Sequence, residues 1–312
     1  MKKILIPFML LIIVIGGCSA INDSNQSEKN NSINENNEEE NEKYDPNHYA
    51  PIQEYTGEGY TLEGASEETG EIANEHREEV DKAVKDFFQK EYKTEVKIHN
   101  IVSAVDGVSV YVESVGDLHF YTYAIVPIDV KNKEIKFQEV WSQEGRVEDA
   151  IAGSLYAIAF EEDFSNLDKY LDGLVEDYPI IGTNMKAIEN VKGNGYTTPY
   201  YFISTFDDTF KELAESYINN TNMSQEELVD FLKKKSIHSD DLKIAIEFYM
   251  DEESLDPDKE IYDMIYKDIE GMEDIPKGEY FISLHDNYVM VEVASGKKDN
   301  TIRETIRNGI FK

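Results

Sequence analysis

The spacing of apolar residues changes abruptly early in the folded part of the chain. Between Ser66 and Tyr92 they recur near every third or fourth position, with Glu and Lys between them, which predicts a helix. The period then becomes two, in β-branched and aromatic runs, with a tight-turn signal at Asp106-Gly107. The predicted strands are Val96–Val105, Gly107–Val115, Leu118–Val130 and Ile135–Val140. Because such short links cannot hold parallel crossovers, we expect an antiparallel meander.

Two helices are predicted after the meander. Val147–Phe160 is apolar on most sides, so we expect it to be buried. Leu167–Tyr178 carries its apolar residues on one face and ends before Pro179.

The second half of the chain mixes both periods. Predicted strands are Met185–Val191, Tyr200–Thr205 and Leu242–Tyr249, with a hairpin of Tyr280–His285 and Tyr288–Val293 around Asp286-Asn287. Predicted helices are Asp207–Asn219, Gln225–Lys235, Pro257–Glu270 and Ile302–Ile310. Ser224 and Glu227 have capping-box spacing, and Asp256-Pro257 has the pattern of an N-cap followed by proline.

These elements predict an α+β fold, an antiparallel β-meander packed with helices. Both halves place a helix before antiparallel strands, so an arrangement of two helix-on-sheet halves is an alternative. No residue-level self-similarity supports a duplication.

The first residues have the pattern of an export signal. Lys2 and Lys3 precede an apolar run from Ile4 to Ile15, which is too short to span a hydrocarbon core of roughly 30 Å comfortably. The run ends in Gly16-Gly17-Cys18, which resembles the lipobox of a bacterial lipoprotein. The resemblance implies cleavage of residues 1–17 and a lipid on Cys18, hence anchoring on the extracytoplasmic face of the cell membrane. An uncleaved anchor or a cleaved, non-lipidated signal is the alternative.

Composition divides the remaining chain. Residues 18–45 are rich in Asn, Glu and Ser, and we expect a disordered tether. Residues 46–62 intersperse tyrosines with Pro and Gly, which indicates an extended arm whose tyrosines pack on the domain surface. We assign residues 63–180 to a first α+β half and residues 181–312 to a second.

The chain is strongly acidic and holds one cysteine. Its formal net charge is −34, and −30 of this lies on Pro46–Lys312, so the acidity belongs to the folded part. Such a surface repels nucleic acid, and we expect no nucleic-acid partner. With Cys18 alone, an intramolecular disulfide, a thiolate metal cluster and, once Cys18 is acylated, a cysteine nucleophile are excluded.

The motifs of several catalytic classes are missing from the sequence. It contains no GxSxG and no HExxH motif, and we predict no catalytic residue, no cofactor and no metal site. His99 and His119 could meet across the first sheet, with Glu113 beside them, and bind a metal or transfer protons. We favour the simpler interpretation that these three residues lie on a solvent-facing strand surface.

Aromatic side chains give the only candidate interaction surface. Trp141 follows a predicted strand, and Tyr196, Tyr200 and Tyr201 surround a Gly/Pro loop. Exposed aromatics on loops stack on sugars or anchor a protein partner, although most tyrosines of a fold cover its core.

The layout resembles an uncharacterised lipoprotein family of Gram-positive bacteria, a domain of unknown function. The residues that carry the resemblance are Cys18 in its lipobox, the polar tether, and the segment from Pro51 to Tyr60. We therefore expect a non-enzymatic, lipid-anchored surface module that binds a protein or cell-wall partner. A carboxylate-using envelope hydrolase and a solute-binding receptor are the alternatives.

Overall fold

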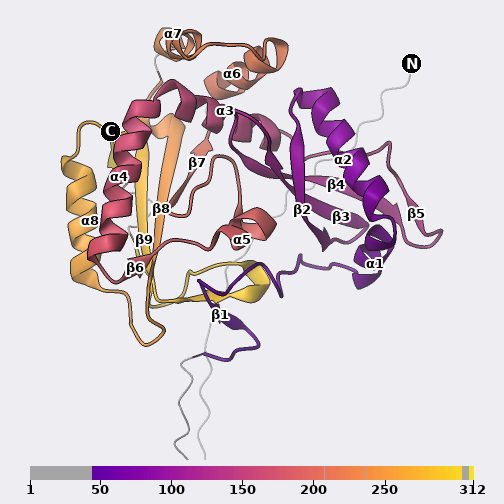
Figure 1. The fold of residues 1–312 in the computed structure, drawn as a ribbon, viewed down its shortest axis with the longest axis horizontal. Helices are drawn as coiled ribbons and strands as arrows, with labels where there is room; N and C mark the ends of the chain where they lie inside the picture. Colours follow the sequence, from indigo (N-terminus) through magenta and orange to yellow (C-terminus); the bar gives the residue numbers. More distant parts are fainter. Residues whose placement is uncertain (1–43, 207, 236, 304–308) are drawn as a thin grey trace, which may run out of the picture. The chain divides into compact units, whose positions relative to one another are not determined.

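The four-stranded meander is present as expected. In this computed structural model, which describes residues 44–206, 208–235, 237–303 and 309–312, the sheet order is β2-β3-β4-β5, antiparallel throughout (Figure 1). Its strands are β2 (Val96–Ser103), β3 (Gly107–Ser114), β4 (Tyr121–Asp129) and the short β5 (Glu134–Ile135). A side chain at Gly107 would place a Cβ 2.4 Å from the carbonyl oxygen of Val126, so the start of β3 requires glycine.

The helix expected over Ser66–Tyr92 is two helices, because the backbone at His76 leaves the helical region. They are α1 (Glu67–Glu75) and α2 (Arg77–Tyr92), and both cover one face of the meander (Figure 1). The break lets α1 lie directly on β2. A Cβ on Gly70 would lie 2.3 Å from the Ser103 hydroxyl.

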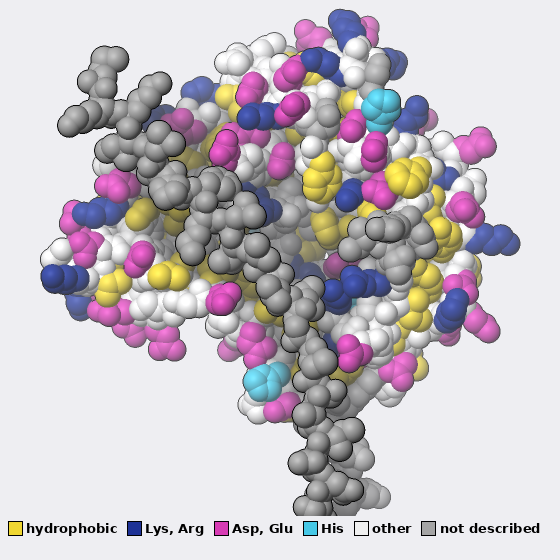
Figure 2. All heavy atoms as spheres, turned by 180° about the vertical axis from the view of Figure 1, so that it is seen from behind, with side chains coloured by type: hydrophobic (Ala, Val, Ile, Leu, Met, Phe, Trp, Pro, Cys, Tyr) yellow, Lys and Arg dark blue, Asp and Glu magenta, His cyan; other side chains and the backbone are white. Residues whose placement is uncertain are grey.

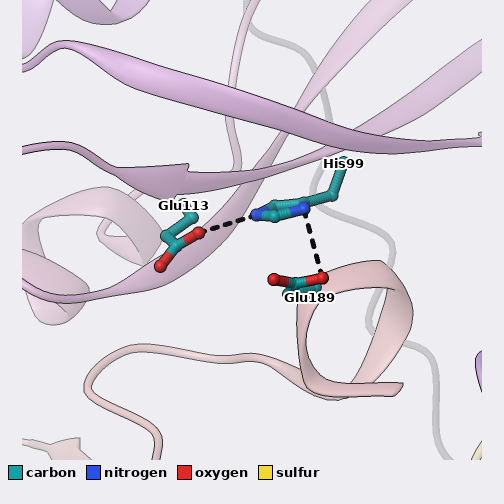
Figure 3. Close-up of side chains that lie close together, drawn as sticks. All are labelled: His99, Glu113 and Glu189. Carbon is teal, nitrogen blue, oxygen red and sulfur yellow. Dashed lines mark hydrogen bonds and ion pairs between the residues drawn. The ribbon is translucent and has the colours of Figure 1, made fainter. Parts of the chain in front are cut away.

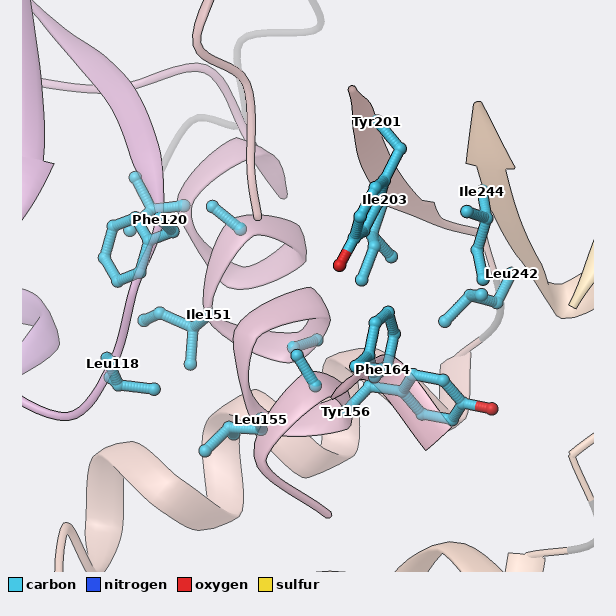
Figure 4. Packing of buried hydrophobic residues seen from close by; sticks show 14 of the residues in the cluster. Leu118, Phe120, Ile151, Leu155, Tyr156, Phe164, Tyr201, Ile203, Leu242 and Ile244 are labelled. Atoms are coloured by element: carbon cyan, nitrogen blue, oxygen red, sulfur yellow. The ribbon is translucent and has the colours of Figure 1, made fainter. Parts of the chain in front are cut away.

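Helix α3 (Arg146–Ala159) lies between the two sheets and is almost fully buried, as its apolar sequence predicted. On one side Ile151 and Leu155 lie toward Leu118 and Phe120 of the first sheet (Figure 4). On the other side α3 contacts β7 of the second sheet. One continuous cluster of buried residues therefore runs through both halves. The amphipathic α4 (Glu161–Asp177) follows α3.

The second sheet is mixed. Its strands are β6 (Ile180–Ile181), β7 (Tyr201–Thr205), β8 (Leu242–Met250), β9 (Glu279–His285), β11 (Ile302–Arg303) and β12 (Ile310–Phe311). Strands β8 and β9 are parallel, and α8 (Lys259–Gly271) makes the crossover that a parallel pair requires. The remaining helices are α6 (Asp208–Asn219), α7 (Gln225–Lys235) and the short η2 (Ser239–Asp241). The predicted capping box of α7 is confirmed, since Ser224 N–H donates to Glu227.

The hairpin predicted around Asp286-Asn287 is wrong. Strand β10 (Tyr288–Met290) pairs with β1 (Tyr49–Pro51), not with β9, and continues into η3 (Val291–Val293). Asp286 and Asn287 are buried, and the Asn287 side-chain amide donates to the Met250 carbonyl. The two residues thus join β9 to other elements and do not form an exposed turn.

Three further elements differ from their predictions. Met185–Val191 is not a strand but α5 (Met185–Ala187) followed by the π-helix η1 (Ile188–Lys192), because its apolar run is too short to distinguish the two periods. The helix predicted at Ile302–Ile310 is wrong at both ends, which form β11 and β12 on β9; residues 304–308 lie outside the described part. The N-cap of α8 is Asp258 and not Asp256, because the Asp258 side chain accepts from the backbone N–H groups of Glu260 and Ile261.

The segment expected to be a surface arm is built into the fold. Ile52 and Tyr55 are fully or almost fully buried in a second cluster that joins Tyr111 of β3 to Tyr249 of β8. The Tyr55 hydroxyl donates to the Val291 carbonyl. The arm thus closes one side of the molecule across both sheets.

The outer surface carries its acidic charge broadly. Acidic side chains are spread over the face in Figure 2, with basic side chains between them. No helix among the described residues is long and apolar enough to cross a membrane.

Candidate functional site

The π-helix η1 positions two charged side chains, Glu189 and Lys192, that no sequence motif marks. It is closed by a hydrogen bond from Gly193 N–H to the Ile188 carbonyl, the five-residue spacing of a π-turn. Such turns occur frequently at functional sites. Glu189 faces the first sheet, and Lys192 faces Tyr249 of the second.

His99 lies between two carboxylates in Figure 3. Its Nε2 is 2.9 Å from Glu113 Oε2, and its Nδ1 is 3.7 Å from Glu189 Oε2. The pairing of β2 with β3 shifts register at His99, and such bulges re-aim side chains. The imidazole is almost fully buried. The cluster therefore joins β2, β3 and η1.

The donor atoms of His99, Glu113 and Glu189 lie within 4.8 Å of one another, which is compact enough for a metal ion. Two ammonium groups already neutralise the carboxylates. Lys97 Nζ is 3.7 Å from Glu113 and 3.8 Å from Glu189, and Lys186 also pairs with Glu189. Burial raises the pKa of Glu189, but the hydrogen bond from Lys186 and the charges around it outweigh this and lower it. The cluster is a charge-balanced network, and a cation would have to displace both lysines.

His99 and His119, which the sequence allowed to meet, lie apart, and the favoured solvent-facing interpretation is wrong for His99, whose side chain is buried against Glu113. The His119 ring packs edge-on against Tyr121 and Tyr196, and its Nε2 is 3.3 Å from the Thr197 carbonyl. His119 lies in the link before β4. Of the two histidines, only His99 lies beside Glu113. The third member, Glu189, belongs to a distant segment that had been predicted to be a strand.

The four aromatic residues proposed from the sequence do not form one surface. Tyr201 is buried, and its hydroxyl donates to Asp168 Oδ1 at 2.9 Å. Tyr196 packs against Tyr201, and Tyr200 lines a separate cavity. Only Trp141 is well exposed, at 48%. Cys18 lies outside the described residues.

Trp141 borders a groove of about 680 Å³ between α2 and the segment around residues 137–142. Its backbone N–H and carbonyl both bond to Ile125 of β4, which holds the backbone of Trp141 against that strand. Phe87, Tyr92 and Phe137 add apolar surface to the same groove.

Glu148, which also lines the groove, has a carboxylate oxygen without a partner in the described part of the chain. Oε2 of Glu148, in the first turn of α3, is buried and has no hydrogen-bond donor among the described residues. Burial and the nearby charges of Glu148 and Glu91 raise the pKa of Tyr92 to about 12. A buried acceptor without a donor is costly, so the Glu148 side chain is held in an unfavourable environment beside the groove.

Comparisons with known proteins match this fold. The family described as "Protein of unknown function (DUF1672)" covers residues 23–312. The crystal structure of a DUF1672 family protein from Staphylococcus aureus has a TM-score of 0.68 at 18% identity, covering 85% of this chain and 98% of that one. None of the curated proteins is similar in sequence. The expected relation to an uncharacterised family is thus confirmed, while its lipid anchor stays a prediction. The chain belongs to the DUF1672 family.

Proposed function

We propose that this protein is a lipid-anchored module on the extracytoplasmic face of the cell membrane. In this proposal it binds a glycan of the cell envelope in the Trp141 groove and does not alter it chemically. The lipobox at Cys18 supports the anchor. The observation that carries the binding role is the exposed Trp141 in a groove that the acidic Glu148 also lines.

The chemistry of the groove favours a sugar over an apolar peptide. A sugar ring offers a flat C–H face for Trp141 and hydroxyl donors for Glu148, whose ionised carboxylate only accepts hydrogen bonds. A purely apolar occupant would cover the rest of the Glu148 side chain without supplying a hydrogen-bond donor. The groove volume of about 680 Å³ lies within the range of small-ligand sites, about 300–1,000 Å³.

The binding experiment uses the chain from residue 19 onward and purified peptidoglycan and wall polysaccharide in a sedimentation assay. We expect Trp141→Ala and Glu148→Gln each to weaken binding by about tenfold or more, the effect of losing a hydrogen bond to a charged group or an aromatic contact. Phe206→Ala removes an exposed aromatic outside the groove and serves as the matched control. Equal binding by all four proteins would refute the role of the groove.

The anchor is tested separately by fractionating cells. Cys18→Ala is expected to move the protein from the membrane fraction to the soluble fraction. Equal partitioning of both forms would refute lipid anchoring and leave the groove proposal untouched.

The envelope hydrolase remains a second candidate because of one carboxylate. Burial raises the pKa of Asp168 against the opposing hydrogen bond from Tyr201. Asp168 also lines a hollow of about 760 Å³ with Glu161 and His119. A hydrolase would release soluble fragments from wall polymers, and Asp168→Asn would abolish that release. Absence of any release by the unaltered protein would exclude this candidate.

A further inference from the structure

A smaller cavity is lined by the residues of η1 that face away from the His99 cluster, among them Lys192. It measures about 270 Å³ and is bounded by η1, the segment from Asn194 to Phe202, strand β8 and residues 293–294. It shares no lining residue with the Trp141 groove. Binding of a ligand in this cavity is therefore independent of the proposed glycan binding.

Lys192 forms one charged wall of the cavity. Its side chain is only 13% exposed, and Nζ donates to the Tyr249 hydroxyl at 3.1 Å and to the Ala294 carbonyl at 3.2 Å. Burial lowers the pKa of Lys192, but Tyr249 and Glu247 outweigh this and hold it above the ordinary value. The side chain is therefore an ammonium ion with one N–H left for a further acceptor.

Glu247 of β8 forms the opposite charge. Its Oε2 lies 3.7 Å from Lys192 Nζ, close enough to attract it but too far for a hydrogen bond. The carboxylate is 32% exposed and accepts no hydrogen bond within the part of the chain that the structure describes. Both charges thus line the same small space with hydrogen-bonding capacity unused.

The remaining walls suit a compact organic group. Tyr60 and Tyr200 present aromatic rings to the cavity. The Tyr60 hydroxyl accepts from Tyr111, which leaves its own hydrogen free to be donated. The Thr198 hydroxyl is already engaged by the backbone N–H groups of Tyr200 and Tyr201, so it shapes the wall and does not contact a ligand directly.

We propose that this cavity binds a free zwitterionic α-amino acid. In this arrangement the ligand carboxylate contacts Lys192, its ammonium contacts Glu247, and its side chain lies between Tyr60 and Tyr200. The Lys192–Glu247 pair is neutral overall, so it matches a ligand without net charge. An anion alone would be repelled by Glu247, and a cation alone by Lys192. The volume is at the lower end of ligand sites and excludes an oligosaccharide.

The test is isothermal titration calorimetry of the chain from residue 19 onward with each of the twenty common L-amino acids. Every amino acid that binds is then compared with the same compound lacking the amino group and with the corresponding amine lacking the carboxylate. We expect at least one amino acid to give a saturable signal, and both truncated analogues to bind at least tenfold more weakly.

Two variants probe the two charges separately. Lys192→Met and Glu247→Gln are each expected to raise the Kd by tenfold or more. The matched control is Lys243→Met. Lys243 lies on β8, the strand of Glu247, but outside the cavity, and its ammonium pairs with Glu279 of β9. This variant should leave the Kd within twofold of the unaltered protein. Should Lys192→Met fail to fold, Glu247→Gln, at a half-buried position, carries the test.

Three results would overturn the proposal. They are the absence of saturable binding across the panel, binding of the deaminated acid as tightly as the amino acid, and an unchanged Kd in Glu247→Gln. None of these results bears on glycan binding, which is measured with Trp141 and Glu148.

Discussion

The stability of the protein should fall markedly between pH 7 and pH 5 because of His285. This residue ends β9, is 3% exposed, and packs its ring 4.9 Å from that of Tyr249. Its Nδ1 lies 3.0 Å from the Thr301 hydroxyl. Burial lowers the pKa of His285 to about 4, so the folded protein holds it neutral.

The charges around His285 act in opposite directions. Glu247 and Asp286 raise its pKa, whereas Lys192 and Lys298 lower it. Desolvation of the imidazolium therefore decides the shift, and the effect belongs to burial more than to any single neighbour.

The sign and size follow from proton linkage. An unfolded histidine titrates with a pKa of about 6.5, so between pH 6.5 and 4 the unfolded chain binds more protons than the folded one. Stability from this residue is complete above pH 6.5 and is lost as the pH falls toward 4. Between pH 7 and pH 5 the expected loss is about 2 kcal/mol.

Urea unfolding at pH 7 and pH 5 measures this loss. The variant His285→Asn keeps a polar group near Thr301 but does not titrate, so its free energy of unfolding should change by about 2 kcal/mol less than that of the unaltered protein over the same interval. Identical pH dependence in the two proteins would refute the assignment of a buried neutral histidine.

Three further perturbations test other parts of the structure. Gly193→Ala places a Cβ 2.4 Å from that of Tyr121 and should cost about 1–3 kcal/mol in thermal unfolding; an unchanged melting temperature would contradict this close approach. Asp286→Asn removes the carboxylate charge 2.7 Å from the buried Lys298 ammonium and should cost about 3–5 kcal/mol in urea unfolding, with a cost below 1 kcal/mol as the contradicting result. Adding Zn²⁺ or EDTA should leave the melting temperature unchanged, because two lysines already neutralise the His99 cluster; a saturable rise with Zn²⁺ would show that a metal displaces them.

The spacing of apolar residues and the turn signals predicted the elements that are determined by residues close together in the sequence. The strict alternation of the first strands and the turn at Asp106-Gly107 predicted the β2–β4 meander, and the apolar run of α3 predicted a buried helix. The pairing of β8 with β9 through α8 could not be derived in this way, because it depends on contacts between segments far apart in the chain. The same cause explains why β10 pairs with the arm and not with β9.

The residues of the candidate sites differ in the same way, between those that have a local feature in the sequence and those whose role depends on contacts between distant segments. Trp141 could be singled out because it is an aromatic residue that directly follows a predicted strand. Glu148 has no local feature that distinguishes it from the many other acidic residues. Glu189 and Lys192 were missed because their significance arises only when η1 folds between the sheets. Tyr201 was misplaced on the surface, since the burial of a loop tyrosine depends on packing that composition does not encode.

The widened turn of η1 explains how one short helix serves two environments. On an α-helix a Glu and a Lys three residues apart lie on the same face and pair, and Lys186 with Glu189 does so here. Glu189 and Lys192 have the same spacing across the π-turn, yet they make contacts on opposite sides, with His99 and with Tyr249. Because the turn keeps these two charges from neutralising each other, Lys192 stays available to the cavity while Glu189 joins η1 to the first sheet.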